Sequence, residues 1–423
     1  MFNVSLMRWI DDRVGNLACN ALAYKKRLLS LLERSKNNGA LPSFKKIAVM
    51  KFFGFGSIVV ASPALAALRE SFPDAEILFV TFKSNKDILE ILRVADRALF
   101  IDTSSLQAFT TSTLQVAATL RREKVDLALD LEFFAKFPLV LANLAGIKQS
   151  AGYYLTQEHW RRTLLDIPGS YNHYFHTKDI FLSLVYLLRT GDLYYVGFDE
   201  FRKRYKYPQI EIRSQELERV QALLRENSVD GDIIVLNPNS SVDLAPEVRK
   251  WPEERYGELA DRILAENPDA HVILIGAKSE EHYVNRVRSH ARNGRVLSLA
   301  GKLSLRELTA LFSIASLLVT NDSGPMHLAC LTDTPIVGLF FGDTPTLFAP
   351  VASRVEVVAP SLYSIPMFTV YNGKDVFAGR PAETIANVPA QTVSVEDVMQ
   401  KVRALLEPAQ HSNGVDEDRP TVH

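Results

Sequence analysis

The fold is indicated most directly by the stretch LLVTNDSGPMHLAC, residues 317–330. Its apolar beginning predicts a buried β-strand over Leu317–Thr320. Small polar residues then predict a turn, and Ser323 suits the residue that caps the following helix. Pro325 suits the first helical turn, where its missing N–H is not needed. A strand end that leads into a helix start offers unpaired N–H groups to a phosphate.

The same alternation continues on both sides of this stretch. Short apolar runs alternate with helical patterns, and this order predicts a parallel sheet covered on both faces. The expected strands are Ile233–Leu236, Val272–Ile275, Val296–Leu299, Leu317–Thr320 and Ile336–Phe341, and the expected helices are Glu253–Ala265, Glu280–His290, Leu305–Ala315 and Pro325–Leu331.

A second series of this kind occupies the first half of the chain. Its expected strands are Ile47–Phe52, Ile77–Phe82, Ala98–Ile101 and Val125–Leu131, and its expected helices lie near Pro63–Glu70, Lys86–Val94, Thr113–Arg122 and Phe134–Leu144. Two doubly wound α/β domains would face each other across a ligand cleft at the carboxyl ends of both sheets. The predicted divisions are an amphipathic helical segment over 1–45, Rossmann-like domains over 46–228 and 229–407, and a disordered tail over 408–423.

Composition narrows the function classes. The chain has 423 residues, more than one core usually supports, and its formal net charge of -1 gives no global basic field for nucleic acid. Cys19 and Cys330 match no disulfide framework and no zinc spacing, which suits a reducing compartment. An uninterrupted run of about 18 apolar residues is absent from the sequence, so no transmembrane helix is expected. These features predict a cytoplasmic protein that does not bind nucleic acid.

The first forty residues combine apolar and basic side chains at helical spacing. One interpretation is an amphipathic helix that lies on an anionic membrane surface. The other is an ordinary helix packed against the first domain. The apolar residues are Trp9, Ile10, Val14, Leu17, Ala21 and Leu22, and the interleaved basic residues include Arg8, Arg13, Lys25, Lys26, Arg27 and Arg34.

Polar residues follow three expected strands of the second half. Hydroxyl and N–H groups in such turns can bind a diphosphate, a lysine can supply a point charge, and a glutamate can accept hydrogen bonds from a ribose. Each residue also has an ordinary structural interpretation, as a helix cap, a surface lysine or a glutamate that stabilises a helix start. The candidates are Ser240, Ser241, Lys250, Glu280, Asp322, Ser323, Gly324 and His327.

The first half carries a second group of candidates. Gly56 and Ser57 follow the first strand, but Val59 occupies the third glycine position of a dinucleotide fingerprint, which argues against an oxidoreductase. Asp130 and Glu132 end the fourth strand, and Lys136 lies just beyond them. Carboxylates at a strand end can serve as a general base, although a loop or helix cap is the alternative.

Together these motifs resemble glycosyltransferase family 9, the lipopolysaccharide heptosyltransferase family, from about Lys46 to Pro350. The segment GSIVVASPAL, residues 56–65, is similar to the family's opening turn and helix. Residues 239–241 and 250–252 resemble its donor-phosphate segment, and residues 338–340 and 344–345 resemble its closing strand and loop. The segment DSGPMHLA, residues 322–329, is similar to its signature and is the most specific match.

The resemblance implies a GT-B fold and an inverting, metal-independent transfer that uses no cofactor. It implies an ADP-heptose donor and a lipid-A-linked core acceptor at the cytoplasmic face of the inner membrane. By motif position, Lys250 would contact the diphosphate and Glu280 the ribose. The turn Asp322–Gly324, with His327, would hold the phosphates. Gly56, Ser57 and Lys136 would lie on the acceptor side.

One residue departs from the family pattern. Classical members carry an aspartate, the usual general base, where this chain has Ser57. Glu132 stands where many members have glutamine, and we hypothesise that Glu132, with Asp130 as second choice, deprotonates the acceptor hydroxyl. Such catalysis contributes about 10²–10⁴-fold. Two alternatives remain: a non-catalytic nucleotide-sugar or glycan-binding homologue that has lost its base, and a GT-B sugar-nucleotide epimerase.

Overall fold

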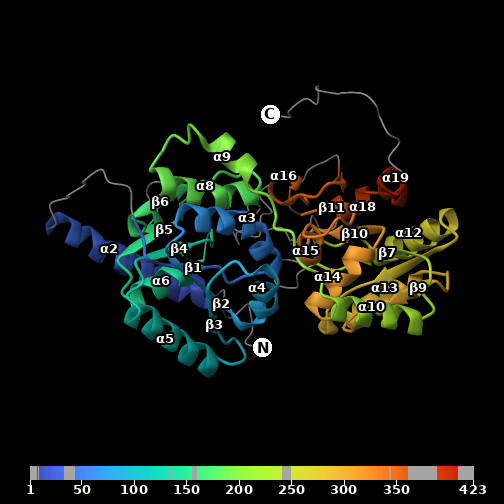
Figure 1. Ribbon diagram of the computed structural model, residues 1–423, viewed down its shortest axis with the longest axis horizontal. Helices are drawn as coiled ribbons and strands as arrows, with labels where there is room; N and C mark the ends of the chain where they lie inside the picture. Colours follow the sequence, from blue (N-terminus) through green and yellow to red (C-terminus); the bar gives the residue numbers. More distant parts are fainter. Residues whose placement is uncertain are drawn as a thin grey trace.

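The structure is a computed structural model that describes residues 7, 9–32, 43–133, 135–154, 160–240, 249–342, 344–360 and 388–407. Within these residues the chain builds two six-stranded sheets. Every strand pair in them is parallel. Figure 1 shows the two sheets side by side, each with helices on both faces. The expected pair of doubly wound α/β units is confirmed.

The first sheet has the strand order β3-β2-β1-β4-β5-β6. Its strands are β1 (Lys46–Met50), β2 (Glu76–Phe82), β3 (Arg97–Ile101), β4 (Leu127–Asp130), β5 (Gln149–Tyr154) and β6 (Ile167–Ser170). The helices that cover it are α3 (Phe55–Ser71), α4 (Lys86–Leu92), α5 (Leu106–Arg122), α6 (Phe137–Leu144), α7 (Trp160–Leu164), α8 (Thr177–Thr190) and α9 (Phe198–Arg204).

The second sheet has the order β12-β11-β10-β7-β8-β9. Its strands are β7 (Asp232–Asn237), β8 (Ala270–Leu274), β9 (Val296–Ser298), β10 (Leu317–Asn321), β11 (Ile336–Leu339) and β12 (Val355–Val358). Its helices are α10 (Ser214–Glu226), α12 (Glu253–Glu266), α13 (Glu281–His290), α14 (Leu305–Ile314), α15 (Gly324–Ala329), α16 (Pro345–Phe348), α18 (Val388–Thr392) and α19 (Val395–Leu406).

Strand order reverses at one place in each sheet, between β1 and β4 in the first and between β7 and β10 in the second. At such a switch point the flanking helices leave on opposite faces, so a crevice opens at the carboxyl ends of the two strands. The carboxylates expected at the end of β4 and the turn expected after β10 both lie at these switch points. The topology therefore places the two groups of candidate residues where α/β sheets bind ligands.

Three strands were not expected from the sequence. β5 and β6 contain small residues, glycine and proline instead of a long apolar run, and β12 is only partly buried. Pro168 is compatible with β6 because this strand lies at the edge of the sheet, where one row of N–H groups is not needed.

Helix α3 begins at Phe55, eight residues before the expected Pro63, and runs straight through that proline. Pro63 cannot donate to the carbonyl one turn earlier. The Ser62 hydroxyl donates to this Val59 carbonyl instead, at 2.6 Å. The proline is thus an interior residue of α3, and the helix starts directly after the turn at the end of β1.

The N-terminal segment forms a π-helical turn, η1 (Asp11–Gly15), followed by α2 (Asn16–Leu32). One face of α2 packs on the first unit, where Cys19 and Ala23 are buried with Leu139 and Trp160. The Lys26 ammonium donates to the Leu164 carbonyl and pairs with Asp166, each at 2.7 Å. The packed-helix interpretation is therefore correct for this face.

Two further observations concern the organisation of the chain. Helix α10 packs against α14 of the second unit, below the sheet in Figure 1. The expected tail, 408–423, lies outside the described residues. In the described part of the chain, every helix is too short or too polar to cross a membrane.

Candidate active site

A pocket of about 350 Å³ lies at the carboxyl ends of β7, β8 and β10. The second unit supplies most of its wall, and Phe55 of α3 reaches it from the first unit. Leu299, Leu303 and Leu308 form an apolar part of the wall. The polar part includes the candidates Ser240, Glu280, Ser323 and Gly324. The pocket therefore gathers residues from three separate sequence motifs.

Three buried asparagines hold the strand ends around this pocket. Asn237 donates to the Thr320 hydroxyl at 2.9 Å and to the Ser323 hydroxyl at 2.8 Å. Asn239 donates to the Ile275 carbonyl at 2.8 Å, which ties β7 to the end of β8. Asn321 donates to the Pro238 carbonyl at 2.8 Å. Buried amides are stabilising only when paired, so these bonds fix the turns in one arrangement.

Two buried polar atoms in the pocket wall have no hydrogen-bond partner among the described residues. They are Oδ1 of Asn239 and Oγ of Ser240, whose residues are 4% and 1% exposed. Leaving a buried polar group unpaired is unfavourable by about 1–3 kcal/mol. A bound molecule that offers a hydroxyl or N–H donor to Asn239 Oδ1 and a phosphate oxygen to the Ser240 hydroxyl would satisfy both atoms. Ser241, the neighbouring candidate, lies outside the described residues.

The turn before α15 differs from its expected form in one respect. Ser323 occupies the N-cap position, but its side chain makes no capping bond and accepts one from Asn237 instead. Asp322 is buried and forms an ion pair with Arg249, a residue that sequence reasoning missed. Helix α15 has only six residues, so its dipole adds less than expected. Side chains and backbone N–H groups of the turn must provide most of the binding.

His327 is buried beneath this turn. Its Nδ1 has no hydrogen-bond partner within the described part of the chain, and its Nε2 lies 3.9 Å from a carboxylate oxygen of Asp322. Burial lowers the pKa of His327 to about 4, and the Asp322 charge only partly opposes the shift. The imidazole is therefore neutral near pH 7, and it can donate one hydrogen bond to an anion without carrying a charge.

Glu280 lines the same pocket, and Lys250 lies near Glu280. Trp251 is fully buried and donates from its indole to the Val393 carbonyl at 3.0 Å, which anchors the neighbouring Lys250. The Lys250 ammonium lies 3.8 Å from the centre of the Tyr283 ring. Burial raises the pKa of Glu280, and Lys250 opposes the shift, so the two charges are within electrostatic reach. Glu280 also accepts from the Ala277 N–H at 2.8 Å.

Gly56 and Ser57 lie in the first turn of α3, where the two units meet. A methyl group built on Gly56 would lie 2.8 Å from the Gly324 Cα and 3.1 Å from the His327 ring. A methyl group on Gly324 would lie 2.4 Å from the Phe55 ring. Both glycines are thus needed for the close approach of α3 to α15, and Ser57 directly follows Gly56 in α3.

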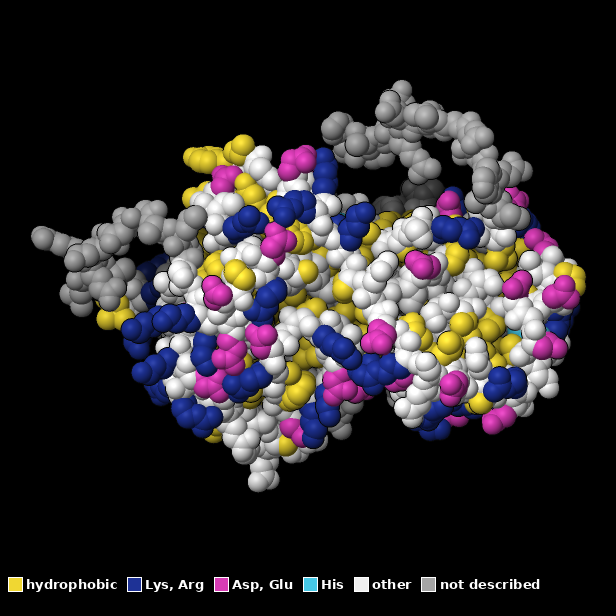
Figure 2. Space-filling view, viewed as in Figure 1, with side chains coloured by type: hydrophobic (Ala, Val, Ile, Leu, Met, Phe, Trp, Pro, Cys, Tyr) yellow, Lys and Arg dark blue, Asp and Glu magenta, His cyan; other side chains and the backbone are white. Residues whose placement is uncertain are grey.

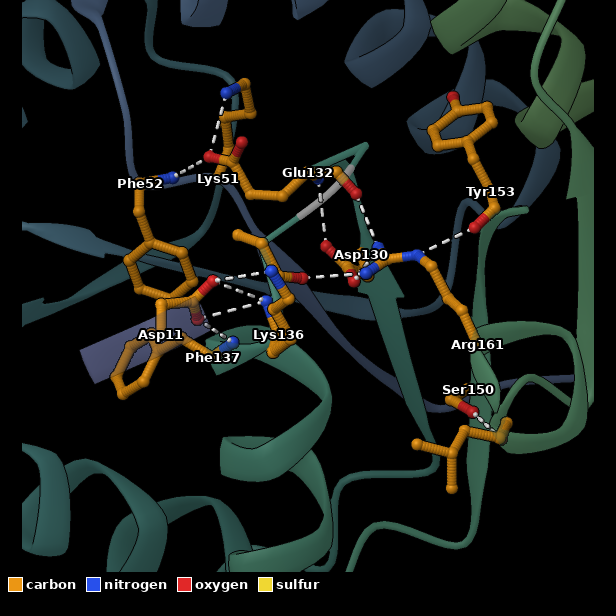
Figure 3. A network of polar contacts seen from close by, with 12 residues as sticks. Asp11, Lys51, Phe52, Asp130, Glu132, Lys136, Phe137, Ser150, Tyr153 and Arg161 are labelled. Carbon is orange, nitrogen blue, oxygen red and sulfur yellow. Dashed lines mark hydrogen bonds and ion pairs between the residues drawn. The ribbon is translucent and has the colours of Figure 1, made fainter. Parts of the chain in front are cut away.

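Glu132 is nearly buried in the network of Figure 3. Its Oε1 accepts from the Lys51 ammonium at 2.8 Å and from the N–H groups of Phe52 and Phe53 at 2.7 and 3.0 Å. No described residue donates to Oε2. Lys51, which sequence reasoning did not single out, directly follows β1 and is 3% exposed. Because three donors already bind Oε1, Oε2 is the oxygen of this carboxylate that is left to accept a hydrogen bond from a substrate hydroxyl.

Asp130 is fully buried behind Glu132, also in Figure 3. It pairs with the Arg161 guanidinium at 2.6 Å and accepts from the Glu132 N–H at 2.9 Å. Burial raises the pKa of Asp130 to about 7, although Arg161 opposes the shift. Arg161 also donates to the Tyr153 and Ala135 carbonyls, each at 2.7 Å. The pair thus braces the loop after β4, and Asp130 itself has no exposed surface.

Lys136 begins the next helix and contacts the N-terminal segment. Its ammonium lies 3.2 Å from the Asp12 carboxylate, and its N–H donates to Asp11 at 3.0 Å. Asp11 also accepts from the Phe137 N–H at 2.8 Å, so it caps α6 across 126 residues of sequence. The carboxylates of Asp11 and Asp12, in the N-terminal segment, are therefore the anionic partners of Lys136.

Comparison with known proteins relates the second half of the chain to one family. The family model for glycosyltransferase family 9 (heptosyltransferase) matches residues 168–372. Lipopolysaccharide heptosyltransferase 3 of Escherichia coli is 24% identical over 69% of this chain and 82% of its own length. The match to lipopolysaccharide heptosyltransferase 2 of Salmonella typhimurium is 28% identical but spans only 26% of this chain and 32% of that protein.

Solved structures agree on the architecture. A glycosyl transferase family 9 protein from Veillonella parvula superposes with a TM-score of 0.67 at 20% identity, over 87% of this chain and 98% of that one. The E. coli ADP-heptose LPS heptosyltransferase II superposes with a TM-score of 0.64 at 18% identity, over 85% and 98%. At these identities the likeness establishes the two-domain GT-B fold. Fold, signature and sequence relatives agree with the family-model match, and residues 168–372 of the chain resemble glycosyltransferase family 9.

Proposed function

We propose that this protein is an inverting, metal-independent glycosyltransferase that moves heptose from ADP-heptose to a lipopolysaccharide-core acceptor. The observation that carries the proposal is the second-unit pocket, where buried Asn239 and Ser240 atoms have no partner in the described residues. The family-model match and the names of the relatives support the heptosyl donor and the core acceptor. The acceptor and its lipid would place the enzyme at the cytoplasmic face of the inner membrane.

In this proposal the donor lies across the pocket. The apolar wall at Leu299 and Leu308 takes the base, and Glu280 accepts hydrogen bonds from the ribose. Ser240 and the turn Asp322–Gly324 bind the diphosphate, with His327 as a neutral donor. Lys250, which lies near Glu280, supplies positive charge. Charge builds up on the leaving diphosphate in the transition state, so donors fixed in advance around it should contribute most to the rate. No metal or other cofactor is required by this scheme.

The acceptor hydroxyl approaches from the first unit. It attacks the anomeric carbon opposite the leaving diphosphate, and its proton passes to Oε2 of Glu132. Lys51 and two backbone N–H groups hold Oε1 of the same carboxylate, which fixes its orientation. Asp130, the second choice from the sequence, is fully buried and paired with Arg161, so in this proposal it positions the loop and does not take the proton. Gly56 and Ser57 allow the two substrates to meet where α3 approaches α15.

The first experiment is thermal unfolding of the full chain with ADP, GDP, UDP or dTDP. A ligand at about 100 times its Kd stabilises the native state by about 2.7 kcal/mol. We expect ADP to raise the Tm and the other nucleotides to raise it less. A preference for another nucleotide would keep the transferase and change the donor. No response to any nucleotide would contradict the donor site.

Lys250→Ala tests the diphosphate contact. The variant should keep nearly the wild-type Tm without ligand, because the buried Trp251 anchors this segment, but should lose most of the ADP-induced increase in Tm and most of its turnover. Lys278→Ala is the matched control, since Lys278 stands between the pocket residues Ala277 and Ser279 and its side chain is 80% exposed. Equal losses in both variants, or wild-type behaviour of Lys250→Ala, would rule out a specific role for Lys250.

Product analysis separates the two alternatives. Incubation with ADP-heptose alone would yield an isomerised nucleotide sugar if the protein were an epimerase. Donor binding without transfer to any core acceptor would instead indicate a non-catalytic homologue, for which Ser57 in place of an aspartate is the relevant feature. Transfer that requires the acceptor supports the enzyme proposed above.

A further inference from the structure

Helix α2 has a second apolar face, which points away from the protein. Leu17, Ala21, Tyr24 and Leu28 are all exposed, Leu17 by 74% and Tyr24 by 66%. At about 100° per residue, these four side chains lie within a sector of about 60°. The buried pair Cys19 and Ala23 lies on roughly the opposite side. We refer to Leu17, Ala21, Tyr24 and Leu28 as the outer stripe.

The surroundings of the outer stripe are basic. Arg13, Lys25 and Arg27 are exposed beside it. The nearby carboxylates of Asp11 and Asp12 face Lys136, which offsets their charge. Trp9 and Val14, in the preceding turns, are exposed by 57% and 55% and extend the apolar surface. Figure 2 shows several Lys and Arg side chains at the left edge of the molecule, the side on which α2 lies in Figure 1.

We propose that the outer stripe is a membrane-docking surface that inserts into the headgroup region of an anionic lipid bilayer. Exposed leucines with a tryptophan and a tyrosine, flanked by cations, match the chemistry of an interfacial helix. The same face paired with a second copy of itself would bring like charges together, which is unfavourable. An anionic lipid surface satisfies both the apolar stripe and the flanking charges.

The position of α2 on the first unit determines which side of the protein would face the membrane. Asp11 caps α6 and contacts Lys136, close to the loop that carries Glu132, and Lys26 ties α2 to the end of α7. The docking helix is therefore fixed to the first unit, which the proposed function assigns to the acceptor. This inference deepens the membrane contact of the proposed function, because it orients the acceptor side of the cleft relative to the lipid.

The test is vesicle co-flotation of the full chain and of the double variant Leu17→Glu, Tyr24→Glu. The vesicles contain phosphatidylethanolamine with phosphatidylglycerol, or phosphatidylcholine alone. We expect wild type to bind the anionic vesicles. The double variant should bind them with an affinity at least about tenfold lower, because two apolar side chains are replaced by negative charges. Leu114→Glu is the control, because Leu114 is 54% exposed on α5 of the same unit and should have no effect.

Three outcomes would overturn the proposal. The first is that the double variant binds anionic vesicles as tightly as wild type does. The second is that wild type binds neither kind of vesicle. The third is that wild type elutes as a dimer and the double variant as a monomer, which would make the outer stripe a self-association face. The flotation assay contains no nucleotide, so its result is independent of the donor-site proposal. Retained stabilisation by ADP in the double variant would confirm that its fold and donor pocket are intact.

Discussion

At the scale of single residues, the two carboxylates at the end of β4 differ in what they can do. Asp130 is buried in the interior and binds Arg161, whereas Glu132 has one oxygen that accepts from three donors and one that accepts from none of the described residues. Burial gives Asp130 a pKa near that of an effective base, about 7, but no path to a substrate. The geometry thus favours Glu132 over Asp130, and its role as the base stays a prediction.

Glu132→Gln should lower the rate of sugar transfer by about 10²–10⁴-fold, because glutamine keeps the shape of the side chain but cannot take a proton. The Kd for ADP should be unchanged, since Glu132 does not line the donor pocket. Single-turnover transfer and calorimetric ADP binding measure the two quantities. Transfer at nearly the wild-type rate would remove Glu132 from the mechanism. A fall in both would point to a structural loss around Lys51, which would be left without its counter-ion.

At the scale of elements, the contact between α3 and α15 depends on two glycines. Gly56 is inside α3, where alanine is ordinarily preferred by about 1 kcal/mol. Here a Cβ at position 56 would meet the backbone of Gly324 at 2.8 Å, closer than real Cβ atoms approach. The free-energy cost of this steric clash should exceed the gain from alanine's helix propensity, because neither backbone can move without shifting a whole helix.

We therefore expect Gly56→Ala to reduce the free energy of unfolding by about 1–3 kcal/mol, measured by the midpoint of urea denaturation at unchanged m. Gly294→Ala provides the matched control. A methyl group there meets nothing within 4 Å, so that variant should stay within about 0.5 kcal/mol of wild type. If Gly56→Ala were as stable as wild type, the two helices would not be in contact in solution.

At the scale of the whole molecule, stability should depend on pH through the buried imidazole between the two units. The folded-state pKa of His327 is lowered to about 4, below the ordinary value of 6.5. Between these values the unfolded chain binds a proton that the folded chain does not. The contribution of His327 to the free energy of unfolding is therefore fully present above about pH 6.5 and is lost as the pH falls toward 4.

His327→Gln isolates this contribution, because the other titrating groups are common to both proteins. The difference in unfolding free energy, wild type minus variant, should fall by an amount on the order of 3 kcal/mol between about pH 6.5 and 4. Urea denaturation at a series of pH values measures it. A difference that does not change with pH would show that His327 is solvated or ionised in the folded protein.

Sequence alone determined the class of fold, because strand and helix periods and the turn after β10 are local properties. It also located most of the residues that line the donor pocket, since the carboxyl ends of parallel strands must meet at one edge. Elements without an apolar run, such as β5 and β6, could not be predicted, because their strand conformation depends on pairing with neighbours. Pro63 likewise predicted a helix start. In the structure it lies inside α3, where the Ser62 hydroxyl donates to the Val59 carbonyl that Pro63 cannot bond.

Only the tertiary structure decided which partners each charged residue has. Arg161 and Asp130 are 31 residues apart, and Asp11 reaches α6 across 126, so no local pattern links them. The structure also divided α2 into a packed face and an outer stripe, whereas the sequence could only identify an amphipathic helix. The physical reason is that burial and ion pairing depend on the distance between side chains in space, and this distance is set when the separate elements pack.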